Sequence, residues 1–222
     1  MTTLRAVLFD MGDTLFGRES GHGSIVEEAA ELGVTVPEAD AARVWADIQA
    51  RARTAEEIAK GRDLSAEAHR EHWTALYSAA DVFVDGLSRA LYEREADPER
   101  WIAYTDTEPT LKTLHVAGVP MGIVSDTGWD YRPVLARHGW LDLFGSVVLS
   151  YEHGAAKPTP HLFLTACAEL GVEPSETLMV GDNALTDGGA INAGLRVLLL
   201  PAATPGGARG LDLVLPLLGV AR

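Results

Sequence analysis

The chain has few cysteines, few aromatic residues and no long apolar run. Its single cysteine, Cys167, excludes an internal disulfide. Because Cys167 lies in the apolar helical pattern FLTACAEL, we expect it to be a buried small side chain. No apolar run approaches the length of a membrane span, and no basic region followed by a long apolar stretch opens the sequence. We therefore expect a cytoplasmic protein with neither a membrane anchor nor a signal peptide.

Positive charge is also scarce. The net charge is −14, and the 222 residues contain three lysines, Lys60, Lys112 and Lys157. Without a basic patch there is little to bind a phosphate backbone, so a nucleic-acid partner is not expected. A small anionic substrate would need a local positive centre, which could be an isolated lysine or a bound metal ion. With 47% hydrophobic residues, the chain can still bury a sizeable core.

Short apolar runs alternate with helical patterns of about ten residues in the second half of the chain, and one more such run lies near its start. Strands are predicted at Leu4–Phe9, Val119–Val124, Ser146–Leu149, Thr177–Val180 and Leu195–Leu200. Helices are predicted at Glu108–Ala117, Tyr131–His138, His161–Leu170 and Ala184–Ala193. This alternation is typical of βαβ units, and it predicts an α/β fold with a parallel sheet.

The segment between the first and second strands has a different texture, rich in Ala, Glu and Arg. Helical periodicity covers Ile25–Leu32, Ala39–Ala59, Ala66–Ala79 and Val82–Arg94, and no strand of comparable quality is found there. We therefore predict a helical insertion at residues 17–105, and a core formed by residues 1–16 and 106–222.

Polar residues stand where the predicted strands end. Asp10, Ser125 and Asp182 each follow an apolar strand, and Lys157 lies in a loop just before a helix. If the strands are parallel, these four groups share one edge of the sheet, where open α/β sheets bind ligands. Two carboxylates, a hydroxyl and an ammonium group predict a site for a divalent cation and an anion of phosphate size.

Four segments make this pattern more specific: FDMGDTL, IVSDTG, AAKPTPHLF and MVGDNALTD. In order and spacing they resemble the four motifs of the haloacid dehalogenase superfamily. The resemblance implies a Rossmann-like core with strands in the spatial order 5-4-1-2-3, and an inserted α-helical cap domain. It also implies a Mg²⁺-dependent hydrolase, here of phosphatase type, that takes a small phosphorylated substrate and acts as a monomer or homodimer.

The resemblance assigns roles to individual residues. Asp10 matches the nucleophile, which forms an aspartyl-phosphate, and Ser125 and Lys157 match the groups that bind the phosphoryl oxygens. Mg²⁺ would be held by Asp10, by the backbone carbonyl of Gly12, and by the acidic pair Asp182 and Asp187, with Asp182 as the direct ligand. Thr14, which matches a residue that braces the turn, and Asp126 are added to the predicted substrate-binding set.

The match breaks at Gly12, where the phosphatases of the family carry the aspartate that acts as general acid and base. The nearest carboxylate is one residue further on, at Asp13, so one alternative gives the acid–base role to Asp13, to the substrate or to water. A second alternative is a branch that needs no such acid: a dehalogenase, or a phosphonate-cleaving enzyme with Lys60 as Schiff base. A third is a catalytically weak or vestigial protein that senses a phosphorylated metabolite.

Three aromatic residues could line the site or fill a core. Trp73 and Tyr77 lie four residues apart on one helical face, and such a pair is expected in the core of the cap. Trp129, shortly after Ser125, is better placed to edge the site.

Overall fold

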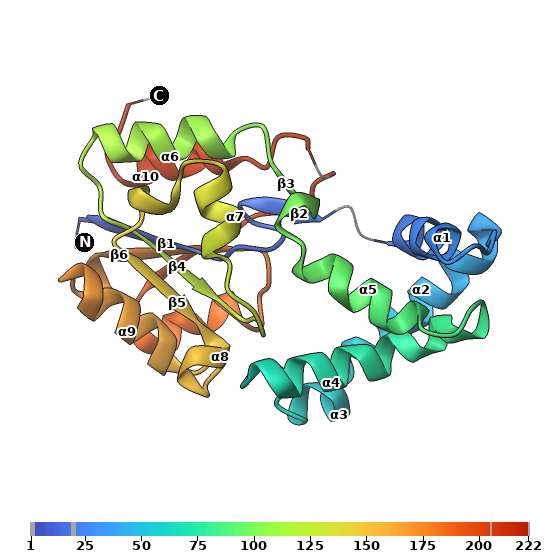
Figure 1. Cartoon of the computed structure of the whole chain (residues 1–222). Coiled ribbons are helices and arrows are strands. Elements are labelled where there is room, and N and C mark those ends of the chain that lie inside the picture. Colours follow the sequence, from blue (N-terminus) through green and yellow to red (C-terminus); the bar gives the residue numbers. More distant parts are fainter. Residues whose placement is uncertain (1–2, 19–20, 205, 222) are drawn as a thin grey trace.

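The first strand, β1 (Ala6–Phe9), lies at the centre of a five-stranded parallel sheet, and every residue in it is buried. This description is of a computed structural model that covers residues 3–18, 21–204 and 206–221 (Figure 1). The strand order is β5-β4-β1-β6-β7. When the five core strands are numbered one to five along the chain and the sheet is read from its β7 edge, this is the predicted order 5-4-1-2-3. The other strands of the sheet are β4 (Met121–Ser125), β5 (Ser146–Leu149), β6 (Thr177–Gly181) and β7 (Arg196–Leu199).

Helices cover both faces of this sheet, as its largely apolar strands require. Val7 and Phe9 on one face of β1 share a hydrophobic cluster with residues of α6 and α10, whereas Leu8 on the other face packs with α9. Figure 1 shows α6 and α10 on one side of the sheet and α9 on the other. The bounds are α6 (Thr107–Val116), α7 (Arg132–Arg137), α8 (Ser150–His153), α9 (Pro160–Leu170) and α10 (Val214–Leu217). The α/β Rossmann-like fold is confirmed, and Cys167 is buried in α9 as predicted.

The inserted segment is helical and has its own hydrophobic cluster, which includes Ile25, Ile48, Leu76 and Tyr77. We call this helical segment the cap; its boundaries at residues 17–105 stay a prediction. Its helices are α1 (His22–Glu31), α2 (Glu38–Ala52), α3 (Ala55–Ala59), α4 (Ala66–Tyr77) and α5 (Leu87–Ala96).

Three features of the cap differ from the sequence prediction. The helix predicted at Val82–Arg94 begins only at Leu87, because Ser78–Val82 form a 3₁₀ helix and Gly86 has a left-handed backbone conformation. The predicted helix 39–59 is broken, because the Thr54 side chain accepts a hydrogen bond from the backbone N–H of Glu57 and starts α3. Two short strands, β2 (Phe16–Arg18) and β3 (Trp101–Ala103), also pair antiparallel where the chain enters and leaves the cap. Three residues are too few to show a strand period in the sequence.

Short 3₁₀ helices complete the chain: η1 (Ser78–Val82), η2 (Pro98–Arg100), η3 (Leu141–Leu143), η4 (Pro174–Glu176), η5 (Asp187–Ala193) and η6 (Leu211–Leu213). The α-helix predicted at 184–193 is therefore wrong, and η5 takes its place. Asn183 bonds the backbone N–H groups of Leu185 and Thr186, and the following Gly188 and Gly189 disfavour an α-helix.

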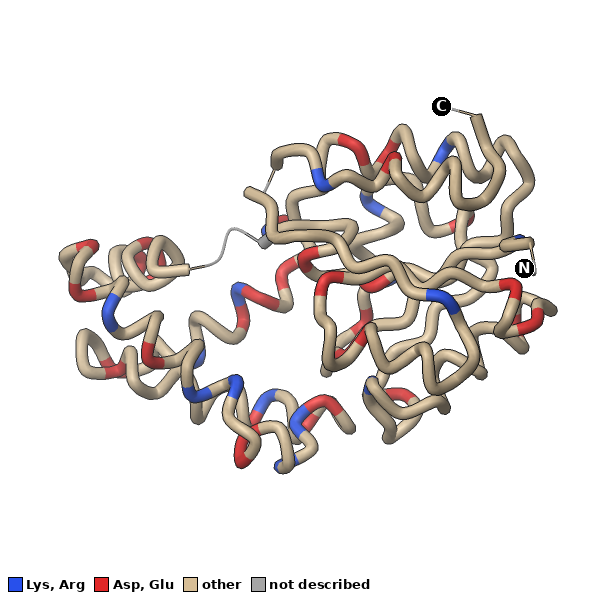
Figure 2. The backbone as a smooth tube through the Cα atoms, turned by 180° about the vertical axis from the view of Figure 1, so that it is seen from behind, with Lys and Arg blue, Asp and Glu red and all other residues tan. Residues whose placement is uncertain are grey.

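Charge is distributed over both parts of the molecule. Figure 2 shows Lys and Arg positions interspersed with Asp and Glu positions rather than gathered along one stretch of the described chain. Among the described residues, no helix is long and apolar enough to cross a membrane.

Candidate active site

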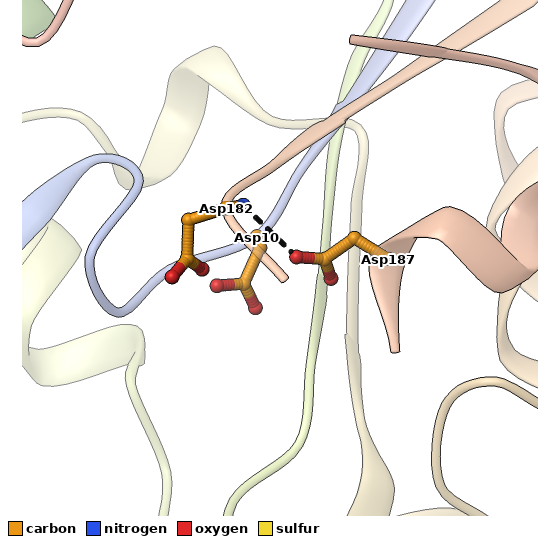
Figure 3. A group of neighbouring side chains, drawn as sticks. All are labelled: Asp10, Asp182 and Asp187. Carbon is orange, nitrogen blue, oxygen red and sulfur yellow. Dashed lines mark hydrogen bonds between the residues drawn. The ribbon is translucent and has the colours of Figure 1, made fainter. Parts of the chain in front are cut away.

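Three carboxylates meet at the carboxyl edge of the parallel sheet. Asp10 directly follows β1, Asp182 directly follows β6, and Asp187 begins η5. One oxygen from each lies within 4.8 Å of the others. Figure 3 shows the three side chains together, with Asp10 between the other two. This convergence is what a parallel sheet imposes on residues that follow neighbouring strands.

Lys157 reaches this group from the loop before α9. Its ammonium Nζ donates to Asp10 Oδ1 at 2.7 Å, to Asp187 Oδ1 at 2.6 Å and to the Val124 carbonyl at 3.1 Å. Its backbone N–H donates to Asp126 Oδ1 at 2.9 Å. The side chain is 3% exposed, so a permanently charged group is held almost out of water by neighbouring carboxylates.

Asp187 organises the loop in which it lies. Its Oδ2 accepts the backbone N–H groups of Asp182 at 3.1 Å and Asn183 at 3.0 Å, while its Oδ1 accepts from Lys157. The Asp187 carboxylate can come this close to the backbone only because residue 181 is glycine: a Cβ there would lie 2.1 Å from Asp187 Oδ2. Asp182 is more exposed, and its carboxylate has none of the hydrogen bonds recorded in the described chain. Asp182 is thus the carboxylate best able to bind a cation directly.

A cavity of about 230 Å³ opens above these residues, between the core and the cap. All the predicted site residues except one line it: Asp10, Gly12, Asp13, Ser125, Asp126, Lys157, Asp182 and Asp187. The exception is Thr14, which is fully buried and does not line the cavity. We therefore no longer count Thr14 among residues that contact substrate; the turn Met11–Phe16 encloses it.

Asp13 has a left-handed backbone conformation, with φ 55°, which aspartate tolerates better than most residues. Its carbonyl accepts a 2.6 Å hydrogen bond from Arg209, a buried residue that the sequence analysis did not single out. The charge of the Asp13 carboxylate helps to raise the pKa of Asp182.

Burial makes Asp10, Asp126 and Asp182 reluctant to ionise. The pKa of Asp10 is raised to about 7, chiefly by desolvation and also by the charges of Asp187 and Asp182, against the attraction of Lys157. Desolvation likewise raises the pKa of Asp126 and of Asp182 to about 6. Burial alone would lower the pKa of Lys157, but the charges of Asp10, Asp187 and Asp126 raise it well above its usual value. The site therefore holds more negative charge than Lys157 can balance.

This imbalance predicts how stability depends on pH. Carboxyl groups with a raised folded-state pKa bind more protons in the folded than in the unfolded protein between about pH 4 and pH 7. In EDTA, the stability that they contribute is therefore present below about pH 4 and lost as the pH rises through 6 to 7. For Asp10 this loss is on the order of a few kcal/mol, since one pKa unit is worth about 1.4 kcal/mol.

A divalent cation should reverse that trend. We expect Mg²⁺ to raise the melting temperature more at about pH 8 than at about pH 5, because it binds ionised carboxylates. Thermal melts with Mg²⁺ or EDTA at both pH values test this. Asp182→Asn should reduce the Mg²⁺-dependent shift, whereas the same change at the exposed Asp142 should not. Equal shifts at both pH values would contradict the prediction.

The cap contributes residues to the cavity that the sequence analysis missed. These are Arg62, Asp63, His69 and Glu95, together with Trp101 of β3. They carry no local signal, since they lie in helices and a turn with ordinary polar patterns. Trp129 lines the cavity as predicted, and Trp73 lines it while also packing against the core of the cap.

Lys60, the residue that a Schiff-base mechanism would need, does not line the cavity. It is the C-terminal cap residue of α3 and pairs with Glu57 at 2.5 Å. The phosphonate-cleaving alternative therefore loses its nucleophile.

The comparisons with known proteins agree with this architecture. The model of the haloacid dehalogenase-like hydrolase family matches residues 4–194. A glyceraldehyde 3-phosphate phosphatase of Methanopyrus kandleri is 38% identical over 97 residues, which are 41% of this chain and 40% of that protein. The matched segments span between 40% and 46% of the first curated relatives' own lengths.

Two solved structures extend the likeness to the whole chain. A HAD phosphatase from Thermococcus onnurineus is 27% identical with a TM-score of 0.64, covering 99% of this chain and 100% of that one. A structure described as a dehalogenase is 26% identical with a TM-score of 0.73, covering 100% of both chains.

Proposed function

The chain belongs to the haloacid dehalogenase-like hydrolases, and from that premise we propose that it hydrolyses a small phosphate ester or acyl phosphate with Asp10 as the nucleophile. The observation that carries this proposal is the group of three carboxylates around one buried lysine. Among the residues that the structure describes, seven carboxyl groups line the cavity, with two permanently cationic side chains, Arg62 and Lys157. A site with this excess of negative charge needs a cation before it can accept an anion.

The carboxylates suit Mg²⁺, which prefers oxygen ligands and takes few of them from protein. Asp10, Asp182 and the Gly12 carbonyl would hold the ion, and Asp187 would keep the Asp182 loop in place. When bound, Mg²⁺ would neutralise the carboxylates and the phosphoryl oxygens. The excess of carboxylates also separates this proposal from dehalogenation, which removes halide from carbon and has no phosphoryl group to neutralise.

The side chains of the site have distinct tasks in this reaction. Asp10 attacks phosphorus and forms an aspartyl-phosphate, which water then hydrolyses. Lys157 holds the Asp10 carboxylate in position at 2.7 Å and offsets negative charge as the phosphoryl group arrives. Ser125, buried at the end of β4, can donate its hydroxyl to a phosphoryl oxygen. Asp126 Oδ1 accepts a hydrogen bond from the backbone N–H of Lys157, so Asp126 positions the Lys157 backbone as well as attracting its ammonium group.

Product analysis tests the proposed reaction. We expect release of inorganic phosphate from p-nitrophenyl phosphate and acetyl phosphate with Mg²⁺, loss of that release in EDTA, and no chloride from 2-chloropropionate. Chloride release without phosphate release would instead establish a dehalogenase. Failure to hydrolyse any of a panel of phosphates, combined with thermal shifts on adding them, would favour a binding protein.

Gly12 permits a direct test of the missing acid. A Cβ at this position would meet its nearest neighbour, the Trp101 ring, at 3.7 Å, so a side chain fits. General acid catalysis is worth roughly 10²–10⁴-fold, and leaving groups of high pKa depend on it most. We therefore expect Gly12→Asp to raise kcat/KM for glycerol phosphate by a larger factor than for p-nitrophenyl phosphate, and the gain is smaller if another carboxyl group already acts as the acid. An equal change for both substrates would contradict this explanation of Gly12.

A further inference from the structure

We propose that Asp63, on the cap, is the general acid and base that Gly12 cannot supply, and that His69 positions it. The proposal rests on the proposed phosphatase function and adds a catalytic residue to it. Asp63 lies in the turn between α3 and α4, far in sequence from the four motifs of the core.

Asp63 faces the same cavity as the nucleophile. It lines the cavity together with Asp10, Ser125 and Lys157, and its side chain is 23% exposed. Its charge interacts with those of Lys157 and Asp126, which lie at the edge of the sheet. A carboxyl group of the cap thus shares the cavity with the core residues that would hold the phosphoryl group.

His69 of α4 lies beside this carboxyl group. His69 Nε2 lies 3.6 Å from Asp63 Oδ1, and its Nδ1 lies 3.1 Å from the hydroxyl of Tyr92. The ring is 5% exposed. Because Tyr92 engages one nitrogen, the other is directed to Asp63. The 3.6 Å separation is longer than a hydrogen bond, and such contacts commonly tighten when substrate binds.

His69 also fixes the cap on the core at this point. A Cβ on Gly128 would lie 2.2 Å from the Cβ of His69, so the histidine rests on the backbone of the loop that follows Ser125 and Asp126. The His69 ring meets the Trp129 ring edge-on, with centroids 4.7 Å apart. Because Gly128 has no side chain, His69 can pack against this loop, and that contact places the neighbouring Asp63 at the cavity.

The surroundings of Asp63 suit a group that gives and takes a proton. Burial raises its pKa, against the opposing charges of Arg62 and Lys157. Arg62 Nε lies 3.5 Å from Asp63 Oδ2. Two further ionisable residues, His69 and Asp126, also face Asp63. A carboxyl group with a raised pKa can be protonated when substrate binds and ionised after the first step.

Two other carboxylates that line the cavity, those of Asp13 and Glu95, are less suitable. The charge of Asp13 acts on Asp182, one of the carboxylates that would hold the cation. The carboxylate of Glu95 accepts a short hydrogen bond from the Tyr77 hydroxyl. Asp63 is the carboxyl group of the cap that a histidine orients and whose charge reaches Lys157.

The proton balance is complete in two steps. First, an Asp10 oxygen bonds to phosphorus as the bond from phosphorus to the leaving oxygen breaks, and the Asp63 carboxyl gives its proton to that oxygen. The product alcohol leaves, and Asp63 is a carboxylate. Second, Asp63 takes a proton from water as the water oxygen bonds to phosphorus and the bond to Asp10 breaks. Inorganic phosphate leaves, and both aspartates return to their starting states.

The test is the dependence of Asp63→Asn on the leaving group. We expect kcat/KM for glycerol phosphate to fall about 10²-fold or more, and for p-nitrophenyl phosphate less than about tenfold. A burst of nitrophenol equal to the enzyme concentration should appear, because the second step loses its base. Asp47→Asn, the same change at an exposed position of α2 outside the cavity, should leave both substrates unaffected.

Two further variants separate catalysis from folding. Gly12→Asp combined with Asp63→Asn should recover glycerol phosphate turnover by restoring a carboxyl group at the other position. His69→Gln should lower kcat/KM for glycerol phosphate more than for p-nitrophenyl phosphate, a split that a general loss of folded protein would not produce.

Several outcomes would overturn the proposal. They are equal losses for both substrates in Asp63→Asn, an unchanged Asp63→Asn, a wild-type enzyme unable to turn over alkyl phosphates, or a leaving-group split produced by Asp13→Asn instead. Activity that survives Asp10→Asn would reject the proposed function itself, so the two failures are distinguishable.

Discussion

Asp10→Asn should lower phosphate release by roughly 10⁴- to 10⁶-fold, the loss typical of removing a nucleophile that works within a group. The carboxamide cannot form the covalent intermediate, yet it keeps an oxygen that can accept from Lys157. Because Asp187 and the Val124 carbonyl still bond the ammonium group, we expect the variant to fold. The measurement is steady-state turnover of p-nitrophenyl phosphate with Mg²⁺.

Two controls make that result specific to the nucleophile. Asp142→Asn changes an exposed aspartate of η3 outside the cavity and should retain full activity. Quenching wild-type enzyme during turnover should give a phosphorylated peptide that contains Asp10, and this product should be absent from Asp10→Asn. Substantial activity in a folded Asp10→Asn protein would exclude the proposed mechanism.

The sequence predicted the core because its signals are local and its topology is restrictive. The strands β1, β4 and β6 are short apolar runs that end at or just before a polar residue, and parallel strands must bring those ends to one edge. Asp10, Ser125 and Asp182 could therefore be grouped without knowing any distance. Even the strand order followed once the family resemblance was recognised.

The cap side of the cavity could not be predicted in this way. Asp63 lies in the polar turn KGRDLS, and His69 lies on a helix whose sequence shows no reason for burying it. Both are placed by the contact between His69 and Gly128, residues 59 positions apart. Helical periodicity identifies which face of a helix is buried, but it carries no information on which distant loop covers that face.

Thr14 shows the converse error. The resemblance matched Thr14 to a residue that braces the turn, and adding it to the substrate-binding set went further than that match. The turn that presents Asp10 and Asp13 to the cavity buries the Thr14 side chain. In so short a turn, the backbone angles decide whether a side chain points into the cavity or into the core, and the residue type does not. The left-handed conformation of Asp13 is an example.

Lys157→Met should affect stability more than any other single change at the site. It removes the cation that bonds Asp10 and Asp187, and it leaves both carboxylates buried without a counter-charge. Removing one partner of a buried ion pair typically costs about 3–5 kcal/mol. Lys112→Met is the matched control, because Lys112 is 63% exposed and pairs with Glu108 on the surface. Surface pairs of that kind contribute about 0–1 kcal/mol.

The pH dependence of Lys157→Met distinguishes electrostatics from lost packing. Lys157 has a raised pKa, so in the wild type its stabilisation is fully present below the ordinary lysine pKa and is lost only as the pH rises through the raised value. Without that ammonium group, the pKa of Asp10 should rise above the value of about 7 that it has in the wild type. The folded variant would then bind more protons than the unfolded chain up to a higher pH, so its stability should keep falling as the pH rises beyond neutrality. Urea denaturation at about pH 5 and about pH 8 should therefore give a larger deficit, relative to wild type, at the higher pH. A deficit that is independent of pH would mean that Lys157 stabilises the fold through its packed side chain and not through its charge.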